Sequence, residues 1–330
     1  MHPSLRWVGK VIVDFSTHLI SPEVGKILVK KPYYAPSTET RGKYQVRYPP
    51  EQADLKVRLG VMERNNIDMQ LLSQTTPVLL GFDAGEAATI CRLSNDSIAE
   101  MCSACPDRFV GCAIVSLLDV DSALEELDRT VLELGFRCVT ISTNQNGRGL
   151  DSPEYYPFYE RVAKLDIPIF LQPTNWEGYP LVDVETGNLM GFFGWPFDTS
   201  QAVWRLIFGG VLDKFPTLKV VTHHLGGMFP YYKNRVLSYS RLSERLSRSL
   251  TSYFEQIYGD TAINGGPMES FMCGYAFFGA DRMLFGSDYP FGRESTIIGD
   301  NVQCIKNMPI PEGEKEKILG GNAKRILKLR

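Results

Sequence analysis

With 330 residues, 44% of them hydrophobic, the chain is long enough for one large barrel or for two domains, and it can bury a large core. Its net charge of −3 and lack of a basic patch argue against a nucleic-acid partner, and no apolar run is long enough to span a membrane. The first ten residues lack the apolar core of a signal peptide, so we expect a cytoplasmic protein.

Short apolar runs recur along the chain, separated by amphipathic or turn-rich stretches. Near-continuous apolar runs are typical of parallel strands that are buried on both faces. We predict eight such strands, at residues 11–13, 68–72, 110–114, 138–141, 169–171, 220–222, 257–260 and 283–285. Helical patterns lie between most of them, for example at 122–135, which ends on a glycine, at 154–165 and at 200–214.

Eight alternations of strand and helix predict a (β/α)8 TIM barrel that forms a single domain over residues 1–330. The main rival is a doubly wound sheet, which often carries a Gly-rich phosphate loop after its first strand, and no such loop follows residue 13. Two long stretches, 21–52 and 174–198, follow strands 1 and 5 and would lie on the catalytic face of the barrel. Loops of this length usually act as lids or interface elements.

The seven cysteines, at positions 91, 102, 105, 112, 138, 273 and 304, are scattered along the chain. An odd, dispersed set argues against a disulfide framework. Cys102 and Cys105 have the spacing of a redox or zinc pair, but no second pair accompanies them. We therefore predict a structural role for both, at the end of a helix that stops before Pro106.

Polar residues with catalytic potential follow three of the predicted strands. His18 follows strand 1, His224 follows strand 6, and Asp288 ends the apolar run of strand 8. The carboxyl ends of barrel strands surround one active-site mouth, so we expect these three side chains to converge there. A lone histidine after a strand is often only a hydrogen-bonded structural residue, and it is the joint placement that indicates chemistry. Because side chains alternate along a strand, we expect His223 to face away from His224 and to pack between barrel and helices.

Four motifs carry a resemblance to a known family. They are the run Gly60-Val-Met-Glu-Arg-Asn-Asn-Ile-Asp68, the stretch His224-Leu-Gly-Gly-Met-Phe-Pro with Arg235 after it, the element Gly286-Ser-Asp-Tyr-Pro-Phe, and the closing Gly321-Asn-Ala. With these motifs the chain resembles the amidohydrolase superfamily, in the branch of aminocarboxymuconate-semialdehyde decarboxylase and its aromatic-acid decarboxylase relatives. The resemblance extends over nearly all of the chain.

The resemblance implies a metal site that this sequence only partly retains. In that branch a His-x-His or Glu-x-His pair after strand 1, a His after strand 5 and an Asp after strand 8 hold the metal, which makes His18 and Asp288 the matching ligands. Ser16 and Gln172 stand where two further ligands belong. Neutral oxygens are weak ligands for zinc, so a divalent metal would be weakly bound, would be a harder ion, or would be gone, and we favour loss or strong weakening. No organic cofactor is implied.

The resemblance also implies how a substrate would be held. His224 matches a catalytic histidine that acts on the substrate or on metal-bound water. Arg235 matches a substrate arginine that in relatives often reaches across a dimer interface, and Phe291 matches an aromatic residue of the substrate pocket. We expect further substrate contacts from Ser16, Gln172 and the aromatics of the second long loop, which are Trp176, Tyr179, Phe192, Phe193 and Trp195.

We therefore predict a carboxy-lyase that removes carbon dioxide from a small aromatic or unsaturated carboxylic acid by acid–base chemistry of His224, Asp288 and His18. The same residues would support a hydrolase that opens a lactone, an amide or a carbon–carbon bond next to a ketone. A third reading is a barrel that has lost its metal and binds a ligand without catalysis. We expect the protein to form a homodimer. We expect its substrate or ligand to be a small carboxylated molecule.

Overall fold

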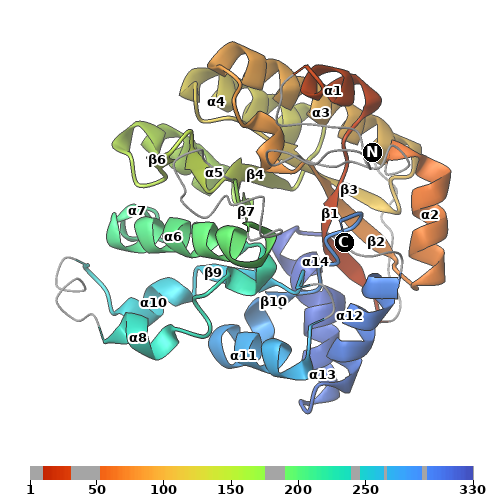
Figure 1. The fold of residues 1–330 in the computed structure, drawn as a ribbon, viewed down its shortest axis with the longest axis vertical. Helices are drawn as coiled ribbons and strands as arrows, with labels where there is room; N and C mark the ends of the chain where they lie inside the picture. Colours follow the sequence, from red (N-terminus) through yellow and green to blue (C-terminus); the bar gives the residue numbers. More distant parts are fainter. Residues whose placement is uncertain are drawn as a thin grey trace.

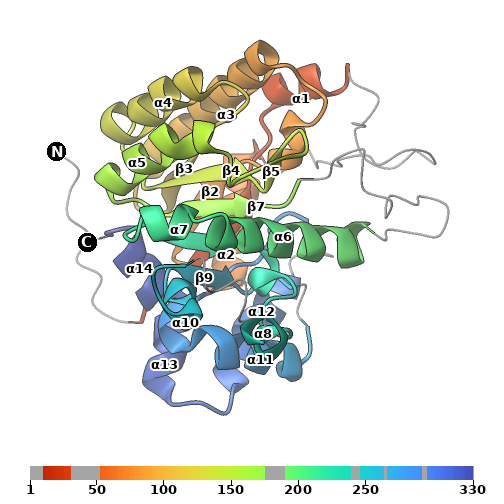
Figure 2. The same ribbon diagram turned by 90° about the vertical axis from the view of Figure 1, so that its left-hand side faces the viewer.

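The computed structural model describes residues 10–30, 53–174, 190–238, 246–263, 266–291 and 296–329. Within them, eight parallel strands form one sheet in the order β1-β2-β3-β4-β7-β8-β9-β10, with helices packed around it (Figures 1 and 2). Backbone hydrogen bonds from Phe15 N to Phe285 O (2.8 Å) and from His18 N to Tyr289 O (2.7 Å) join the first strand to the chain at and after the last one. The sheet thus closes on itself, and the predicted (β/α)8 barrel is confirmed.

The barrel strands agree with the predicted runs to within a few residues, except at the start of the chain. Their bounds are β1 (Val13–His18), β2 (Met69–Ser73), β3 (Phe109–Ile114), β4 (Cys138–Ser142), β7 (Ile169–Gln172), β8 (Val220–Thr222), β9 (Ile257–Asp260) and β10 (Met283–Leu284), with a hairpin of β5 (Asn144–Gln145) and β6 (Arg148–Gly149) between β4 and β7. Strand β1 begins at Val13 and runs through His18, where the sequence predicted 11–13. Its polar residues can be buried because Asp14 and Ser16 find hydrogen-bond partners inside the barrel.

Helices cover the outside of the barrel (Figure 2). The α-helices are α1 (Pro22–Leu28), α2 (Leu55–Arg64), α3 (Ala84–Ala104), α4 (Val120–Asp128), α5 (Tyr156–Leu165), α6 (Trp195–Phe208), α7 (Val211–Lys214), α8 (Lys233–Leu237), α10 (Leu250–Phe254), α11 (Met268–Phe278), α12 (Thr296–Asn307), α13 (Glu312–Glu316) and α14 (Asn322–Ile326). Shorter helical turns are η2 (Thr76–Leu79), η3 (Arg129–Glu133), η4 (Pro153–Tyr155), η5 (Met190–Gly194), η6 (His224–Gly226), η7 (Ala280–Arg282) and η8 (Lys317–Gly321). Among the helices described, none is both long and apolar enough to cross a membrane.

Two helices lie within stretches that the sequence analysis assigned to loops. Helix α1 occupies the start of the 21–52 stretch, where Ser21 Oγ accepts a hydrogen bond from Val24 N and Pro22 takes the first helical position. Helix α6 begins at Trp195, five residues earlier than expected, and also has a proline in its first turn. Residues 31–52 and 175–189 of these stretches lie outside the described residues.

Side chains from all eight strands fill the interior of the barrel. The set is Val13, Phe15, Met69, Leu71, Cys112, Cys138, Phe170, Val221, Tyr258 and Leu284, each at most 6% exposed. Ala323, Ile326 and Leu327 of the last helical segment pack into the same cluster next to Val11, and so cover the amino-terminal end of the barrel. An apolar plug at this end leaves the carboxyl ends of the strands as the place for polar chemistry.

The cysteines form no disulfide, as the sequence analysis expected. Cys102 lies in the last turn of α3, and burial raises the pKa of its thiol to about 12. A thiol that stays protonated at neutral pH is a poor nucleophile and a poor metal ligand. This chemistry supports a structural role for the Cys102-Ser-Ala-Cys105 segment.

The contact between η8 and the start of β1 gives a test of the plug. A Cβ atom on Gly320 would lie 2.0 Å from the carbonyl oxygen of Val11, a backbone atom that cannot move aside cheaply. We expect Gly320→Ala to lower the free energy of unfolding by about 1–3 kcal/mol, measured by urea denaturation. Gly313→Ala in α13 is the matched control, because a Cβ there meets nothing within 4 Å. Equal stability of the two variants would contradict the proposed close packing.

Candidate active site

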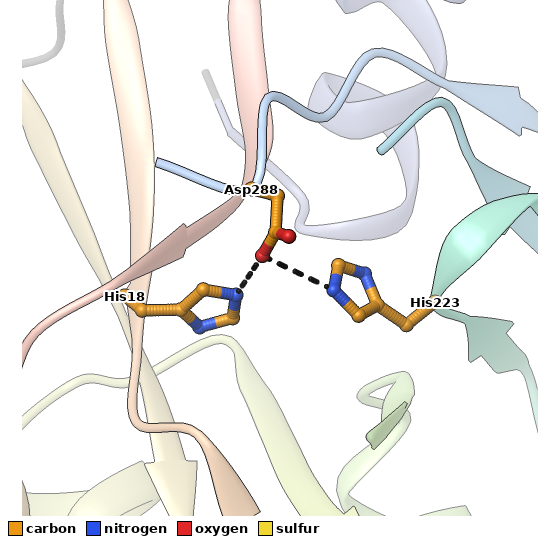
Figure 3. Close-up of side chains that lie close together, drawn as sticks. All are labelled: His18, His223 and Asp288. Atoms are coloured by element: carbon orange, nitrogen blue, oxygen red, sulfur yellow. Dashed lines mark hydrogen bonds and ion pairs between the residues drawn. The ribbon is translucent and has the colours of Figure 1, made fainter. Parts of the chain in front are cut away.

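Two histidines and a carboxylate from distant parts of the chain meet at the carboxyl ends of the strands (Figure 3). His18 ends β1, His223 directly follows β8, and Asp288 lies in the loop after β10. The Nε2 atom of His18 lies 3.0 Å from Oδ1 of Asp288, and the Nε2 atom of His223 lies 3.3 Å from the same oxygen. The structure thus brings His18 and Asp288 together and adds His223 to them.

His224 lies at the edge of this cluster. Its Nε2 atom is 3.9 Å from Oδ2 of Asp288, the oxygen that the other two histidines do not share. Its ring stacks on the indole of Trp195, with centroids 5.9 Å apart and planes inclined by 4°. Its Nδ1 atom is buried and has no hydrogen-bond partner among the described residues. A buried polar atom of this kind is a candidate for contact with a substrate.

The backbone at the site is strained. His224, Leu225 and Asp288 have φ angles of 51°, 54° and 62°, in the left-handed region that costs a non-glycine residue about 1–2 kcal/mol. Left-handed residues of this sort cluster at functional sites, where the surrounding structure holds them. Gly227 continues the turn with φ 63°, and a Cβ atom there would lie 2.2 Å from the carbonyl oxygen of Pro196. This glycine therefore lets the turn pack directly against the start of α6.

The prediction that His223 packs between barrel and helices was wrong. Val221 belongs to the cluster that fills the barrel, and side-chain alternation places His223 on the same inner side two residues later. Strand β8 ends at Thr222, and the left-handed backbone of His224 then redirects the chain. Both imidazoles therefore reach the cluster, and their ring centroids are 3.8 Å apart.

Sequence reasoning also missed Asp260, the last residue of β9. Its Oδ2 atom lies 2.6 Å from Nδ1 of His223, and the carboxylate is fully buried. The available signal was an acidic residue at the end of an apolar strand, the same signal that identified Asp288. On the other side of the cluster, Ser73 Oγ lies 3.1 Å from Nδ1 of His18. His18 and His223 are thus each held in place through the second ring nitrogen.

The charges of the cluster are strongly coupled. Burial opposes charge on His223, but Asp260 and Asp288 outweigh it and raise the pKa of this imidazole to about 10. Burial also opposes ionisation of Asp288, yet His223 and His18 hold its pKa well below the usual range. Burial, followed by the charge of His223, lowers the pKa of His224 to about 3, and burial lowers that of His18. Without a metal, the centre at pH 7 therefore holds ionised Asp288, protonated His223 and neutral His224.

The remaining predicted residues divide into those near the cluster and those away from it. Ser16 Oγ lies 3.3 Å from Nδ1 of His223, and the ring of Phe291 lies 5.6 Å from that of His18. Gln172 is buried at the end of β7, and its Nε2 atom has no hydrogen-bond partner among the described residues. Arg235 is exposed on α8 and is not part of the cluster. Trp176 lies outside the described residues.

The donor set bears directly on metal binding. Ser16 and Gln172 offer only neutral side chains, so the ligand set expected from the family resemblance does not fit here. His18, His223 and Asp288 nevertheless each offer one ligand atom, and these atoms all lie within 4.8 Å of one another. Two imidazoles and a carboxylate are a common donor set for divalent transition metals. The residues present therefore fit a metal, with a different third ligand.

Comparison with known proteins decides the family. A family model described as amidohydrolase matches residues 13–329. The chain belongs to the amidohydrolase family. The match covers all eight strands of the barrel and every member of the cluster.

Relatives of this amidohydrolase are carboxy-lyases. The chain is 31% identical over 283 residues to 2-amino-3-carboxymuconate-6-semialdehyde decarboxylase of Dictyostelium discoideum, covering 84% of this chain and 77% of the relative. It is also 31% identical over 294 residues to gamma-resorcylate decarboxylase of Rhizobium sp., covering 82% and 86%. The two relatives act on different carboxylic acids and share the decarboxylation step.

Solved structures of similar fold include decarboxylases of hydroxylated aromatic acids. A 2,6-dihydroxybenzoate decarboxylase from Rhizobium superposes with a TM-score of 0.81 at 26% identity, over 97% of this chain and 99% of the other. A 5-carboxyvanillate decarboxylase from Novosphingobium aromaticivorans, solved with manganese and 4-hydroxy-3-methoxy-5-nitrobenzoic acid, superposes with a TM-score of 0.85 at 24% identity, over 97% of both chains. The latter likeness supports the barrel fold alone.

The coupled charges predict how the stability of chelator-treated protein depends on pH. His18 and His224 have lowered pKa values, so their contribution is present above the unfolded value of 6.5 and is lost as pH falls below it, which for His224 continues down to about 3. His223 has a raised pKa, so its contribution is present below 6.5 and is lost as pH rises toward about 10. We expect the free energy of unfolding, measured with urea from about pH 5 to about pH 10, to be highest near neutrality.

The variant His223→Asn separates the two sides of this profile. It should lose the decline above neutrality and keep the decline below it, because the buried neutral histidines remain. An alkaline decline of the same steepness in native protein and in this variant would show that His223 does not carry the charge.

Proposed function

We propose that this chain is a decarboxylase of a small, planar, hydroxylated aromatic or unsaturated carboxylic acid. The observation that supports this most directly is the convergence of His18, His223, His224 and Asp288 at the carboxyl ends of the barrel strands. The relatives that share this barrel remove carbon dioxide from acids of that kind. A cytoplasmic location remains our prediction from the sequence.

The proton balance favours His224 as the group that moves the proton. Asp288 is held ionised by its two imidazole neighbours, so it is a poor acid in the resting site. His224 is neutral at pH 7, and the lowered pKa of about 3 makes it a weak base but a strong proton donor once it carries a proton. A proton that His224 takes up from solvent is passed to the ring carbon that carries the carboxylate. The bond to the carboxylate then breaks, carbon dioxide leaves, and the electron pair of that bond restores the aromatic ring, while the substrate hydroxyl keeps its proton throughout.

The surroundings of His224 suit an aromatic substrate. Trp195 already stacks on its ring, and Phe291 lies next to His18, so flat apolar surfaces border the polar cluster. Nε2 of Gln172, which has no hydrogen-bond partner within the described part of the chain, can donate to a substrate carboxylate or hydroxyl oxygen. A divalent metal, when bound, would supply a Lewis acid that polarises these substrate oxygens. The orientation of the substrate acid would then be set by Trp195, Phe291 and Gln172.

Carbon dioxide release tests the proposed reaction. We expect the protein to release carbon dioxide from at least one acid in a panel of hydroxybenzoates, carboxyvanillate and related unsaturated acids. His224→Asn should lower kcat on that acid by about 10²–10⁴-fold, because it removes the group that moves the proton. His2→Asn is the matched control, since it makes the same chemical change in a histidine near the amino terminus to which no role in the site is assigned.

Other outcomes of this assay separate the alternatives. Hydrolysis of lactones or amides without release of carbon dioxide would favour the hydrolase reading. Saturable binding of hydroxybenzoates that His224→Asn leaves unchanged, with no turnover of any compound, would favour a binding protein. Full activity of His224→Asn would contradict the role of this residue.

The exposed position of Arg235 supports a homodimer in which it serves the site of the partner. Tyr231, four residues before Arg235 in the sequence, is a large aromatic that is 78% exposed. A guanidinium at such an interface can hold a substrate carboxylate in a bidentate contact.

Mixing two inactive variants tests whether this arginine acts across subunits. Arg235→Ala and His224→Asn should each be nearly inactive alone. Co-expressed, they should regain activity, because one site of each mixed dimer has a native His224 and a native Arg235. No recovery in dimers shown to be mixed would contradict action across the interface.

A further inference from the structure

A metal at this centre needs a third strong donor, because positions 16 and 172 offer only neutral side chains. We propose that His223 supplies it, and that this chain binds a divalent first-row transition ion through His18 Nε2, His223 Nε2 and a carboxylate oxygen of Asp288. Relative to the ligand set that the family resemblance implies, one ligand is thereby moved from the end of β7 to the end of β8. The proposal deepens the proposed function, but its test measures metal binding and not turnover.

The spacing of the donor atoms suits a metal. Ligands about 2.0–2.2 Å from one ion, at tetrahedral or neighbouring octahedral angles, lie about 2.8–3.6 Å from each other. Oδ1 of Asp288 lies 3.0 Å from Nε2 of His18 and 3.3 Å from Nε2 of His223, and all three atoms fall within 4.8 Å of one another. Figure 3 shows the rings of His18 and His223 side by side, each directing a nitrogen at the carboxylate of Asp288.

Both histidines also have the supporting contacts of metal ligands. A histidine that binds a metal through one ring nitrogen usually donates the proton on the other to a carboxylate or another oxygen, which fixes the tautomer and the ring orientation. Nδ1 of His223 lies 2.6 Å from Oδ2 of Asp260, and Nδ1 of His18 lies 3.1 Å from Oγ of Ser73. In this tautomer the lone pair of each Nε2 faces the centre.

His224 lacks these features and is not a ligand in this proposal. Its Nδ1 atom has no partner among the described residues, so no oxygen there fixes its tautomer. Its ring is placed by stacking on Trp195, and its Nε2 atom lies 3.9 Å from the second oxygen of Asp288. This arrangement leaves His224 available to the substrate while His223 serves the metal.

The charges at the centre agree with this assignment. Asp260 is fully buried and Asp288 is 8% exposed, so the two carboxylates that contact His223 both have little access to water. Buried charges are costly unless they are balanced by opposite charge. A divalent ion bound by His18, His223 and Asp288 would balance both carboxylates, with Asp260 acting through the ring of His223.

Metal titration of the full-length protein tests the proposal. Chelator-treated native protein, titrated calorimetrically with Mn²⁺ and with Co²⁺, should bind one ion per chain. Loss of an outer partner of a ligand typically weakens metal affinity about 10–100-fold, which we expect for Asp260→Asn, and His223→Ala should weaken it further. Gln172→Ala is the matched control at the position where relatives would carry the ligand, and it should leave the affinity unchanged. Gln172→His in the His223→Ala background should restore binding.

A measurement on the native protein guards against misfolding of the His223 variant. Pulsed electron paramagnetic resonance of the Cu²⁺-loaded protein counts coordinated imidazoles, and two are expected. A single coordinated imidazole, native affinity in folded His223→Ala, or no stoichiometric binding of Mn²⁺, Co²⁺ or Cu²⁺ would each overturn the proposal. These outcomes leave the proposed decarboxylation to its own assay, since carbon dioxide release is measured separately.

Discussion

The carboxylate of Asp288 connects the closure of the barrel with the assembly of the site. Its backbone N–H donates to Ser16 O across the seam between β1 and the chain after β10, at 2.9 Å. Its side-chain oxygen Oδ1 contacts Nε2 of His18 at 3.0 Å and Nε2 of His223 at 3.3 Å. A buried carboxylate is stable only with such partners, and its left-handed backbone persists only where neighbours hold it. The barrel therefore cannot close in this register without also bringing the two imidazoles together.

A second set of buried polar groups holds strand β1 in place at this seam. Asp14 accepts hydrogen bonds from the N–H and the hydroxyl of Ser287, at 2.9 and 2.6 Å, and burial raises its pKa to about 7. The guanidinium of Arg58, fully buried, donates to the carbonyl oxygen of His18 and to Gln70. Hydrogen bonds of this kind hold the reactive side chains at fixed positions before a substrate arrives, which is where most electrostatic catalysis originates.

The site departs from the ligand pattern that the family resemblance implies, while the barrel fold is kept. Neutral Ser16 in β1 and neutral Gln172 at the end of β7 stand where that pattern has ligands, and His223 and Asp260 place an imidazole after β8 and a carboxylate at the end of β9. Ser16 Oγ lies 3.3 Å from Nδ1 of His223, so the small side chain at position 16 borders the additional ring. These changes act together in space although they are far apart in the sequence. Function depends on such local sets of residues more than on the barrel that carries them.

The local pattern of the sequence was sufficient for the strands, their order and the positions of His18 and Asp288. Strands buried on both faces leave apolar runs, and an acid at the end of such a run is visible without coordinates. The inward direction of His223 and the role of Asp260 were decided only by the tertiary structure. Which side of β8 faces the interior depends on how the strand is set in the closed sheet, and the pairing of His223 with Asp260 joins residues 37 positions apart on neighbouring strands. Periodicity describes alternation within one strand, but only packing of all eight strands decides which side faces the barrel axis.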